Sequence, residues 1–189
     1  MLTVKAKSSS IYTLRVQLER IEPLIWRRLQ VPTSITLPKL HDVLQAAMGW
    51  TDSHLHSFEI GGKHYGMAEE AEELEFIDEK GVKLERVLGE SIGELGYEYD
   101  FGDSWDHRIS VESKTRAKAD WPYPLCIGGA RACPPEDVGG NYGYEEFLQA
   151  IRDPKHEEHD NWLLWAGGLF DPEGFDANAA NYRLRSPRI

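Results

Sequence analysis

Hydrophobic and polar residues alternate along two stretches near the start of the chain, and this alternation predicts two β-strands. The first stretch is 11–21 and the second is 24–31, which lies between Pro23 and Pro32. Proline cannot donate a hydrogen bond to a strand ladder, so it suits the ends of a strand. The second stretch has apolar residues on both faces. We therefore expect either an edge strand or a strand that is covered on both sides.

Apolar residues then recur at helical spacing, which predicts a helix. Thr36 can cap its start, Pro38 suits its first turn and Gly49 can end it. The apolar positions are Leu40, Val43, Leu44, Ala47 and Met48. His41 lies beside this apolar stripe, and we interpret it as a half-buried packing residue.

A third alternating stretch, 54–60, predicts a strand that ends at Gly61 and Gly62. Because side chains two positions apart on a strand share a face, His54 and His56 would point the same way. Two histidines in this arrangement suit a transition metal. The simpler interpretation is that the pair caps an apolar strand at the edge of the sheet.

The clearest pattern is a β-hairpin over 97–112, where two alternating runs flank Gly102-Asp103-Ser104. A three-residue loop at this position would make one face of the hairpin apolar apart from His107. The expected cross-strand pairs are Phe101 with Trp105, Tyr99 with His107, Tyr97 with Ile109, Leu95 with Val111 and Glu98 with Arg108.

The same register would place Asp100 opposite Asp106, with Asp103 at the turn. Opposed carboxylates are unfavourable by roughly 0.2–1 kcal/mol unless a cation lies between them. Arg108 could supply that cation, and so could Mg²⁺, Mn²⁺ or Ca²⁺, which prefer oxygen ligands. The alternative is a neutralised surface trio with a local side-chain turn at Asp103.

The remaining chain predicts one long loop, two helices and a turn-rich tail. The stretch 119–143 shows neither the alternation of a strand nor the spacing of a helix, and a loop of this length is usually functional or disordered. Its aromatic residues, cysteines and prolines indicate an ordered loop. We expect helices over 144–152 and 156–165, and few regular elements over 170–182. This order predicts an α+β fold, with a mainly antiparallel sheet and helices on one face. Residues 1–189 would form one domain, with 1–10 and 184–189 as loose tails.

Composition narrows the functional classes. The chain has 189 residues and a net charge of −11, which argues against broad binding of nucleic acids or anionic membranes because both require a basic surface. No apolar run has the length of a signal peptide core or a membrane span. We therefore expect a cytoplasmic protein.

An acidic segment, 67–80, carries seven carboxylates against a single lysine. Such a block is usually a solvated loop or an exposed helix face. The functional alternative is a docking surface for a basic protein partner. The acidic residues are Glu69, Glu70, Glu72, Glu73, Glu75, Asp78 and Glu79.

Five residues could form a zinc site, namely His54, His56, His107, Cys126 and Cys133. Zinc requires three or four such ligands at about 2.0–2.3 Å. The two cysteines are not spaced as in common structural zinc sites, so buried reduced thiols are the simpler interpretation. A disulfide between them would contribute about 2–3 kcal/mol, but the expected compartment disfavours it.

The stretch 134–143 is rich in glycine but lacks the lysine of a phosphate-binding P-loop. We place Glu145 and Glu146 in the first turn of the next helix, where they would repel an anion. A phosphate site is therefore rejected. Glu136 and Asp137 could still act as a general base or as oxygen ligands, or they could cap a neighbouring helix.

These motifs together resemble one family, the plasmid pRiA4b ORF-three-like proteins. The resemblance covers nearly the whole chain, and it implies one α+β domain found in bacteria and archaea, often near mobile elements. It implies no established activity. Some relatives carry a resolvase label, but this chain has neither a serine among arginines nor a basic DNA-binding region. The matching stretches are Ile25–Arg28 with Val31-Pro32, Leu40-His41 with Met48–Trp50, His54–Phe58, Tyr97–His107, Ala132–Gly140, Gly143-Tyr144 and Phe170–Pro172.

We therefore expect a binding or regulatory module whose ligand or partner site lies between the hairpin and the loop 126–143. An exposed aromatic groove near Trp105 or Trp121 would mark such a site. The alternative is a divalent-metal-dependent hydrolase or nuclease that uses Asp100, Asp103, Asp106 and His107. The candidate binding residues are Asp100, Asp103, Trp105, Asp106, His107, Arg108, Glu136 and Asp137. The cofactor is unknown, with a divalent metal as one option and a small ligand as another.

Overall fold

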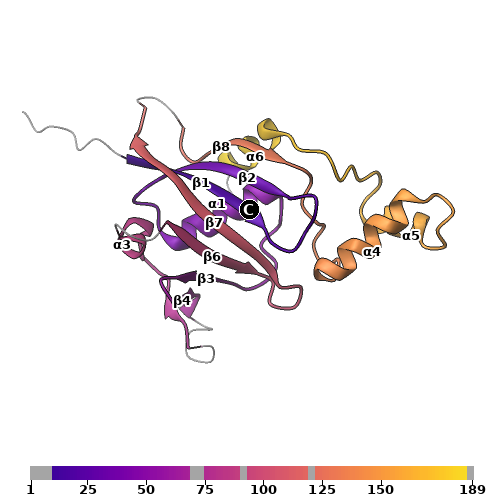
Figure 1. Ribbon diagram of the computed structural model, residues 1–189, viewed down its shortest axis with the longest axis horizontal. Helices are drawn as coiled ribbons and strands as arrows, with labels where there is room; N and C mark the ends of the chain where they lie inside the picture. Colours follow the sequence, from indigo (N-terminus) through magenta and orange to yellow (C-terminus); the bar gives the residue numbers. More distant parts are fainter. Residues whose placement is uncertain (1–9, 69–74, 90–92, 119–121, 187–189) are drawn as a thin grey trace, which may run out of the picture.

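Eight strands form one sheet in the computed structural model, which describes residues 10–68, 75–89, 93–118 and 122–186 (Figure 1). The strand order is β5-β4-β3-β6-β7-β1-β2-β8. Neighbouring strands are antiparallel except β4 and β5. The strands are β1 (Ser10–Leu18), β2 (Trp26–Pro32), β3 (His56–Ile60), β4 (Lys63–Gly66), β5 (Ile77–Asp78), β6 (Glu94–Tyr99), β7 (Trp105–Arg116) and β8 (Leu125–Ala130).

Five helices lie in the described part of the chain. Helix α1 packs on one face of the sheet with α6 beside it, whereas α4 and α5 extend from one end of the sheet (Figure 1). The helices are α1 (Leu37–Met48), α3 (Leu84–Leu88), α4 (Gly140–Arg152), α5 (His159–Trp165) and α6 (Ala177–Arg185). The α+β fold with a mainly antiparallel sheet is therefore confirmed. None of these helices combines the length and the apolar character that a membrane span requires.

The core lies between α1 and the central strands. Strand β1 turns Leu14, Val16 and Leu18 toward the core, and all three are fully buried. Helix α1 covers them with the apolar stripe seen in its sequence, including Leu40 and Leu44. The apolar face of the alternating strand and the apolar stripe of the helix thus pack against each other in one layer.

The opposite face of the sheet carries paired polar side chains. Arg28 donates two hydrogen bonds to the carboxylate of Glu112, at 2.7 and 2.8 Å. The guanidinium of Arg15 lies over the ring of Trp26, 4.4 Å from its centroid. Strand β2 is not an edge strand, because β1 and β8 flank it on either side.

The hairpin of β6 and β7 forms in a different register from the one we expected. Tyr99 pairs with Trp105, Tyr97 with His107 and Leu95 with Ile109. The predicted partners were thus wrong by two positions, because the loop runs from Asp100 to Ser104 rather than over three residues. A shift of two preserves the alternation of faces. The apolar face was therefore predicted correctly although its pairs were not.

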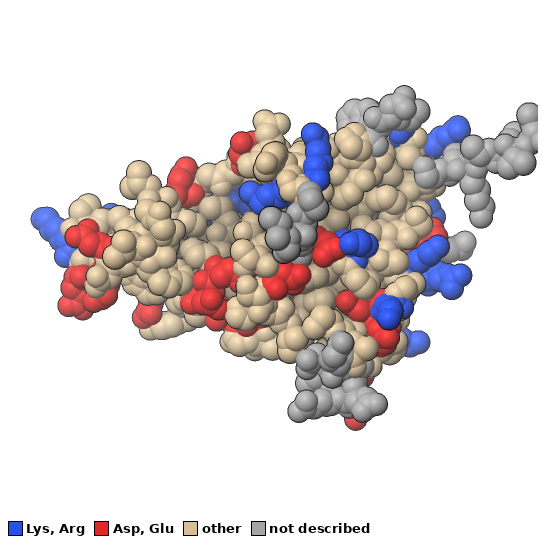
Figure 2. All heavy atoms as spheres, turned by 180° about the vertical axis from the view of Figure 1, so that it is seen from behind, with Lys and Arg blue, Asp and Glu red and all other residues tan. Residues whose placement is uncertain are grey.

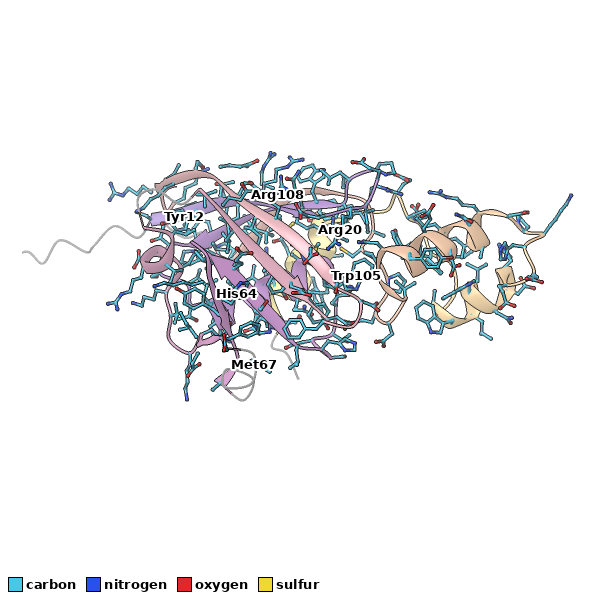
Figure 3. All side chains as sticks on the ribbon, turned by 60° about the horizontal axis from the view of Figure 1, so that its bottom comes forward. Tyr12, Arg20, His64, Met67, Trp105 and Arg108 are labelled. Carbon is cyan, nitrogen blue, oxygen red and sulfur yellow. The ribbon has the colours of Figure 1, made fainter. Side chains whose placement is uncertain are left out.

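The longer loop removes the predicted opposition of Asp100 and Asp106. Asp100 lies outside the ladder, and Glu98 faces Asp106 instead. Asp106 forms an ion pair with Arg20, whose side chain is labelled in Figure 3. Arg108 also does not pair with Glu98, because it lies 2.6 Å from Glu19 and 3.0 Å from Glu94.

Two predicted irregular segments contain regular elements. The stretch 119–143 includes strand β8, which pairs with β2, and the first residues of α4. The tail forms α6, which includes Leu184 and Arg185 rather than leaving them in a loose end. Because α4 begins at Gly140, Glu145 and Glu146 lie beyond its first turn, so this reason against an anion site was wrong.

Candidate functional site

Three loops meet at one end of the sheet. They are the hairpin loop 100–104, the loop 50–55 between α1 and β3, and the loop 131–139 before α4. Backbone and side-chain hydrogen bonds join them. The backbone N–H of Asp100 donates to the carbonyl oxygen of Leu55 at 2.8 Å, and the indole of Trp50 donates to the carbonyl oxygen of Pro134 at 2.9 Å.

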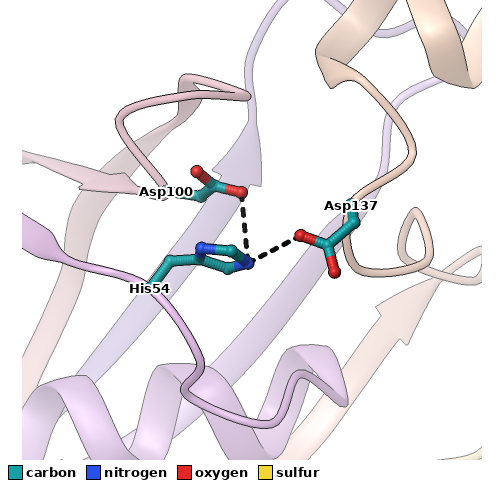
Figure 4. Close-up of side chains that lie close together, drawn as sticks. All are labelled: His54, Asp100 and Asp137. Atoms are coloured by element: carbon teal, nitrogen blue, oxygen red, sulfur yellow. Dashed lines mark ion pairs between the residues drawn. The ribbon is translucent and has the colours of Figure 1, made fainter.

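His54, Asp100 and Asp137 bring one side chain from each of these loops to a single point (Figure 4). The Nε2 atom of His54 lies 2.8 Å from Oδ1 of Asp137 and 3.6 Å from Oδ2 of Asp100. Among the described residues, this is the one group of three or more His, Cys, Asp or Glu side chains whose ligand atoms all lie within 4.8 Å of one another. It is therefore the candidate metal centre.

Asp100 divides its two carboxylate oxygens between the loop and the site. Oδ1 accepts hydrogen bonds from the backbone N–H groups of Gly102 (3.0 Å) and Asp103 (3.3 Å). Oδ2 faces His54. The expected side-chain turn therefore forms at Asp100 and not at Asp103. This arrangement fixes the carboxylate while leaving one oxygen directed into the cluster.

Glu136 lies against the cluster and is held from behind. Its Oε1 accepts hydrogen bonds from the backbone N–H of Thr51 at 2.7 Å and from the hydroxyl of Thr51 at 3.2 Å. The hydroxyl of Tyr99 donates to both of its oxygens at 3.2 Å. Oε2 also lies 3.7 Å from Nε2 of His54.

Tyr99 joins the strand β6 to two of the loops. Its hydroxyl accepts a hydrogen bond from the backbone N–H of Ser53 at 3.0 Å while donating to Glu136. Burial raises the pKa of Tyr99 well above its ordinary value, and the charge of Glu136 raises it further. The hydroxyl therefore keeps its proton and remains a donor at neutral pH.

Asp137 closes the cluster on the solvent side. Its side chain is 69% exposed, in contrast to 10% for Asp100. Asp103, next to the cluster, accepts a hydrogen bond from the backbone N–H of Gly139 at 3.1 Å and so ties the hairpin loop to the start of α4. Acidic side chains gather on this side of the molecule beside α4 and α5 (Figure 2).

The spacing of the donor atoms suits a metal ion. Two ligand atoms that each bind a metal at about 2.1 Å lie about 3.0 Å apart when adjacent and about 4.2 Å apart when opposite. The distances from His54 Nε2 to Asp100 and Glu136 are 3.6 and 3.7 Å, within this range, and the distance to Asp137 is slightly shorter at 2.8 Å. Among the described residues, Nε2 of His54 is buried yet makes no hydrogen bond of acceptable geometry.

Several predicted site residues lie elsewhere. Trp105 is 1% exposed and belongs to the core, so it cannot line an exposed groove, and Trp121 is outside the described residues. His107 is also buried, and its Nδ1 donates to the carbonyl oxygen of Tyr97 at 3.2 Å. Asp106 pairs with Arg20 instead, and neither Asp103, Asp106 nor His107 belongs to the group of ligand atoms around Asp100. The hydrolase that would use these four residues stays a prediction.

The five predicted zinc ligands are not brought together either. His54 precedes β3 rather than belonging to it, and it points to a different place from His56. His56 is buried against Glu79, with its Nε2 3.2 Å from each oxygen of that carboxylate.

Both cysteines are free, buried thiols, as the simpler interpretation had it. The sulfur of Cys133 accepts a hydrogen bond from Arg27 at 3.1 Å. Cys126 lies on β8, where its backbone N–H donates to the side chain of Asn181 at 2.8 Å. Burial raises the pKa of both thiols, so they stay protonated at neutral pH.

The acidic segment differs from a uniformly solvated loop at one position. Glu79 is 4% exposed, whereas Glu75 and Asp78 are exposed. Residues 69–74 lie outside the described residues, so a docking surface for a basic partner is not tested.

The sequence pattern did not identify His54 as a residue of this cluster, nor Thr51 and Tyr99 as its supports. His54 was assigned to a strand face because the alternation of β3 extends backward through it. One local signal was available in the sequence. Asp52 is a residue type that tolerates left-handed backbone and so marks a turn directly before His54; in the structure it adopts φ 64°. The pairing of loops that are more than 30 residues apart has no local signal.

Comparison with known proteins identifies the family. Residues 10–179 match the family described as plasmid pRiA4b ORF-3-like protein. The chain belongs to this family. The match covers all the residues of the candidate metal centre.

Two similar proteins match this chain over most of its length. The chain is 41% identical over 175 residues to the uncharacterized protein y4hQ of Sinorhizobium fredii, and this alignment covers 92% of the chain and 88% of the relative. A crystal structure of a protein of unknown function, MM3350 from Methanosarcina mazei Go1, matches with a TM-score of 0.83 and 39% identity. That match covers 90% of this chain and 97% of the other.

Proposed function

We propose that this family member is a metal-binding protein that holds a divalent transition metal between the hairpin loop and the loop before α4. His54, Asp100 and Asp137 would be the ligands, and Glu136 would lie beside them. The observation that supports this most directly is the position of His54 Nε2, which is buried among carboxylate oxygens without a well-formed hydrogen bond.

The donor set indicates the class of metal. One imidazole nitrogen with two carboxylates suits Mn²⁺, Fe²⁺ or Zn²⁺, whereas Mg²⁺ and Ca²⁺ prefer oxygen ligands alone. Three protein ligands leave positions for water. The exposed side chain of Asp137 gives these positions access to solvent.

The competing explanation is an ion pair, in which a protonated His54 neutralises Asp137 and no metal is involved. The two explanations predict opposite results when a metal is added. A metal raises the melting temperature only if it binds the folded state more tightly than the unfolded chain, so a stabilising effect of added metal favours the metal site over the ion pair. A protonated imidazole nitrogen has no lone pair for a metal, so an ion-paired His54 would have to lose its proton before it could act as a ligand.

Isothermal titration calorimetry of the full chain with Mn²⁺, Zn²⁺ and Mg²⁺ tests the proposal, beginning from metal-free protein. We expect one site per chain for Mn²⁺ or Zn²⁺, weaker binding of Mg²⁺, and a rise in melting temperature with the bound metal.

Matched variants separate the site from the general acidity of the surface. His54→Ala and Asp137→Asn should each abolish the site or weaken it by at least tenfold. His64→Ala removes an exposed histidine on β4, and Asp160→Asn removes an exposed carboxylate on α5; neither should alter binding. Equal binding by wild type and His54→Ala would show that the metal binds elsewhere.

A second function follows if the bound metal activates water, and we propose phosphoester hydrolysis as its test reaction. A divalent metal lowers the pKa of a bound water and can polarise a phosphoryl oxygen. The solvent-facing position beside Asp137 favours this use. Hydrolysis of bis(4-nitrophenyl) phosphate by the Mn²⁺-loaded protein, lost in His54→Ala, would support it. Metal binding without hydrolysis would contradict the second function and support metal binding alone.

A further inference from the structure

Each residue of the loop segment 51–54 is bonded to a different part of the molecule. Thr51 donates to Glu136, the backbone N–H of Asp52 donates to Gln45 Oε1 at 3.1 Å, and Ser53 donates to Tyr99. His54 then faces the two aspartates. These hydrogen bonds hold the segment in place, and the segment in turn positions His54, the one nitrogen ligand of the candidate metal centre.

This segment turns through an unfavourable backbone conformation at Asp52. Its φ of 64° lies in the left-handed region, which a residue other than glycine holds only where its surroundings support it. The support comes from α1. Nε2 of His41 lies 2.6 Å from Oδ1 of Asp52, and Gln45 holds the backbone of the same residue.

The hydrogen bonds around His41 fix the orientation of its ring. A carboxylate oxygen accepts, so Nε2 of His41 is the donor in its contact with Asp52. Nδ1 lies 2.9 Å from the hydroxyl of Tyr97, and that hydroxyl accepts from Nε2 of Gln45 at 3.1 Å. Both ring nitrogens of His41 are therefore held, one by Asp52 and the other by Tyr97.

A second histidine holds the plane of the His41 ring. The rings of His41 and His56 are stacked with centroids 3.6 Å apart and planes inclined by 11°. His56 is itself held by Glu79, which is buried at the end of the acidic segment. His41 is 5% exposed, so the ring has little freedom to turn away from Asp52.

We infer that His41 is a positioning residue for the candidate metal centre, acting through Asp52 on the loop that carries His54. This inference rests on the proposed metal site. His41 acts through Asp52 and is not itself one of the proposed ligands. The sequence pattern had indicated only a packing residue at this position. Partners of this kind typically change metal affinity by about 10–100-fold when they are removed.

Calorimetric titration of the full chain with Mn²⁺ tests this with two variants at one position. His41→Leu removes both hydrogen bonds of the ring, and we expect binding to weaken by about tenfold or more. His41→Gln retains an N–H group that can reach Asp52, so it should recover most of the affinity. The visible absorption of the Co²⁺-loaded protein should change in His41→Leu, because the ligand geometry changes.

A core variant that does not touch the loop provides the control. Phe147→Leu creates a small defect between α4 and α5, where Phe147 packs against Trp162 and Trp165, so it should lower the melting temperature without changing the affinity or the Co²⁺ spectrum. If His41→Leu does not fold, Asp52→Gly removes the acceptor of the same contact and tolerates the left-handed region.

The outcomes distinguish the two proposals. A wild-type protein that binds no Mn²⁺, Zn²⁺ or Co²⁺ overturns the metal site and this inference with it. Wild-type binding with unchanged affinity and spectrum in His41→Leu overturns only the positioning role. An equal loss in His41→Leu, His41→Gln and Phe147→Leu also overturns it, because general destabilisation would then explain the effect.

Discussion

Gly140 Cα approaches the backbone of Asp103 so closely that a Cβ atom at this position would lie 2.6 Å from the carbonyl oxygen of Asp103. The contact brings the start of α4 against the hairpin loop. It lies beside the hydrogen bond from Gly139 to Asp103. The two loops that supply Asp100 and Asp137 to the cluster are therefore joined by a backbone approach that only glycine permits.

Gly140→Ala should lower stability by about 1–3 kcal/mol, because the methyl group overlaps a carbonyl and the φ of 67° strains it. It should also weaken Mn²⁺ binding by displacing Asp137. Urea unfolding and calorimetry measure the two effects. Gly81→Ala is the matched control, since Gly81 has φ 74° with no atom within 4 Å of its added Cβ. Equal effects of both variants would exclude a role for the close approach.

Tyr99→Phe should weaken metal binding by about tenfold, because Glu136 loses the donor that holds both of its oxygens. It should also cost about 1–2 kcal/mol, since the backbone N–H of Ser53 loses its acceptor. Calorimetric titration and urea unfolding measure these changes. Tyr12→Phe removes a hydroxyl from a buried tyrosine on β1, far from the loops, and should alter neither quantity. A Tyr99→Phe protein of full affinity would contradict the support role.

Stability should fall between pH 7.5 and pH 5 in part through His107. Burial lowers its pKa from 6.5 to about 4, so the unfolded chain binds more protons in this window and stability decreases as pH falls. The two pKa values give a loss on the order of 2 kcal/mol at pH 5. The loss is complete below the folded pKa.

Urea unfolding at both pH values checks this, with His107→Asn as the comparison. The asparagine amide can replace the Nδ1–H donor to Tyr97 and has no titrating group in this range. The difference between the two pH values should therefore be smaller in the variant by about the same amount. An identical pH dependence in both proteins would show that His107 does not contribute.

Glu79→Gln should destabilise the fold by about 1–2 kcal/mol, because an amide oxygen is a weaker acceptor for the buried His56 than a carboxylate oxygen. Glu75→Gln removes an exposed carboxylate from the same acidic segment and should change stability by less than about 0.5 kcal/mol. Urea unfolding at neutral pH compares them. If the two variants are equally stable, Glu79 does not anchor the segment to the core.

The local patterns predicted elements whose core face is continuous in sequence. Helix α1 follows its apolar period from Leu37 to its end at Gly49, which adopts φ 101° as expected of a terminating glycine. The face of the hairpin was also predictable, because alternation by two distinguishes inside from outside. Strand β8 and helix α6 were missed, since glycine in the former and polar residues in the latter obscure their periods.

The candidate metal centre was predicted only in part. Asp100, Glu136 and Asp137 were identified as oxygen donors, but they were not expected to meet His54. Asp103 was predicted as a ligand and instead joins two loops.

The sequence by itself determined which side of β1 and of the hairpin strands faces the core, where α1 begins and ends, and which residue types could bind a metal. Only the tertiary structure decided the hairpin register and the convergence of His54, Asp100 and Asp137. The physical reason is that a period of two is unchanged by a shift of two residues, so it specifies a face but not a partner. The meeting of three distant loops depends on contacts such as that of Gly140 with Asp103, which no local pattern records.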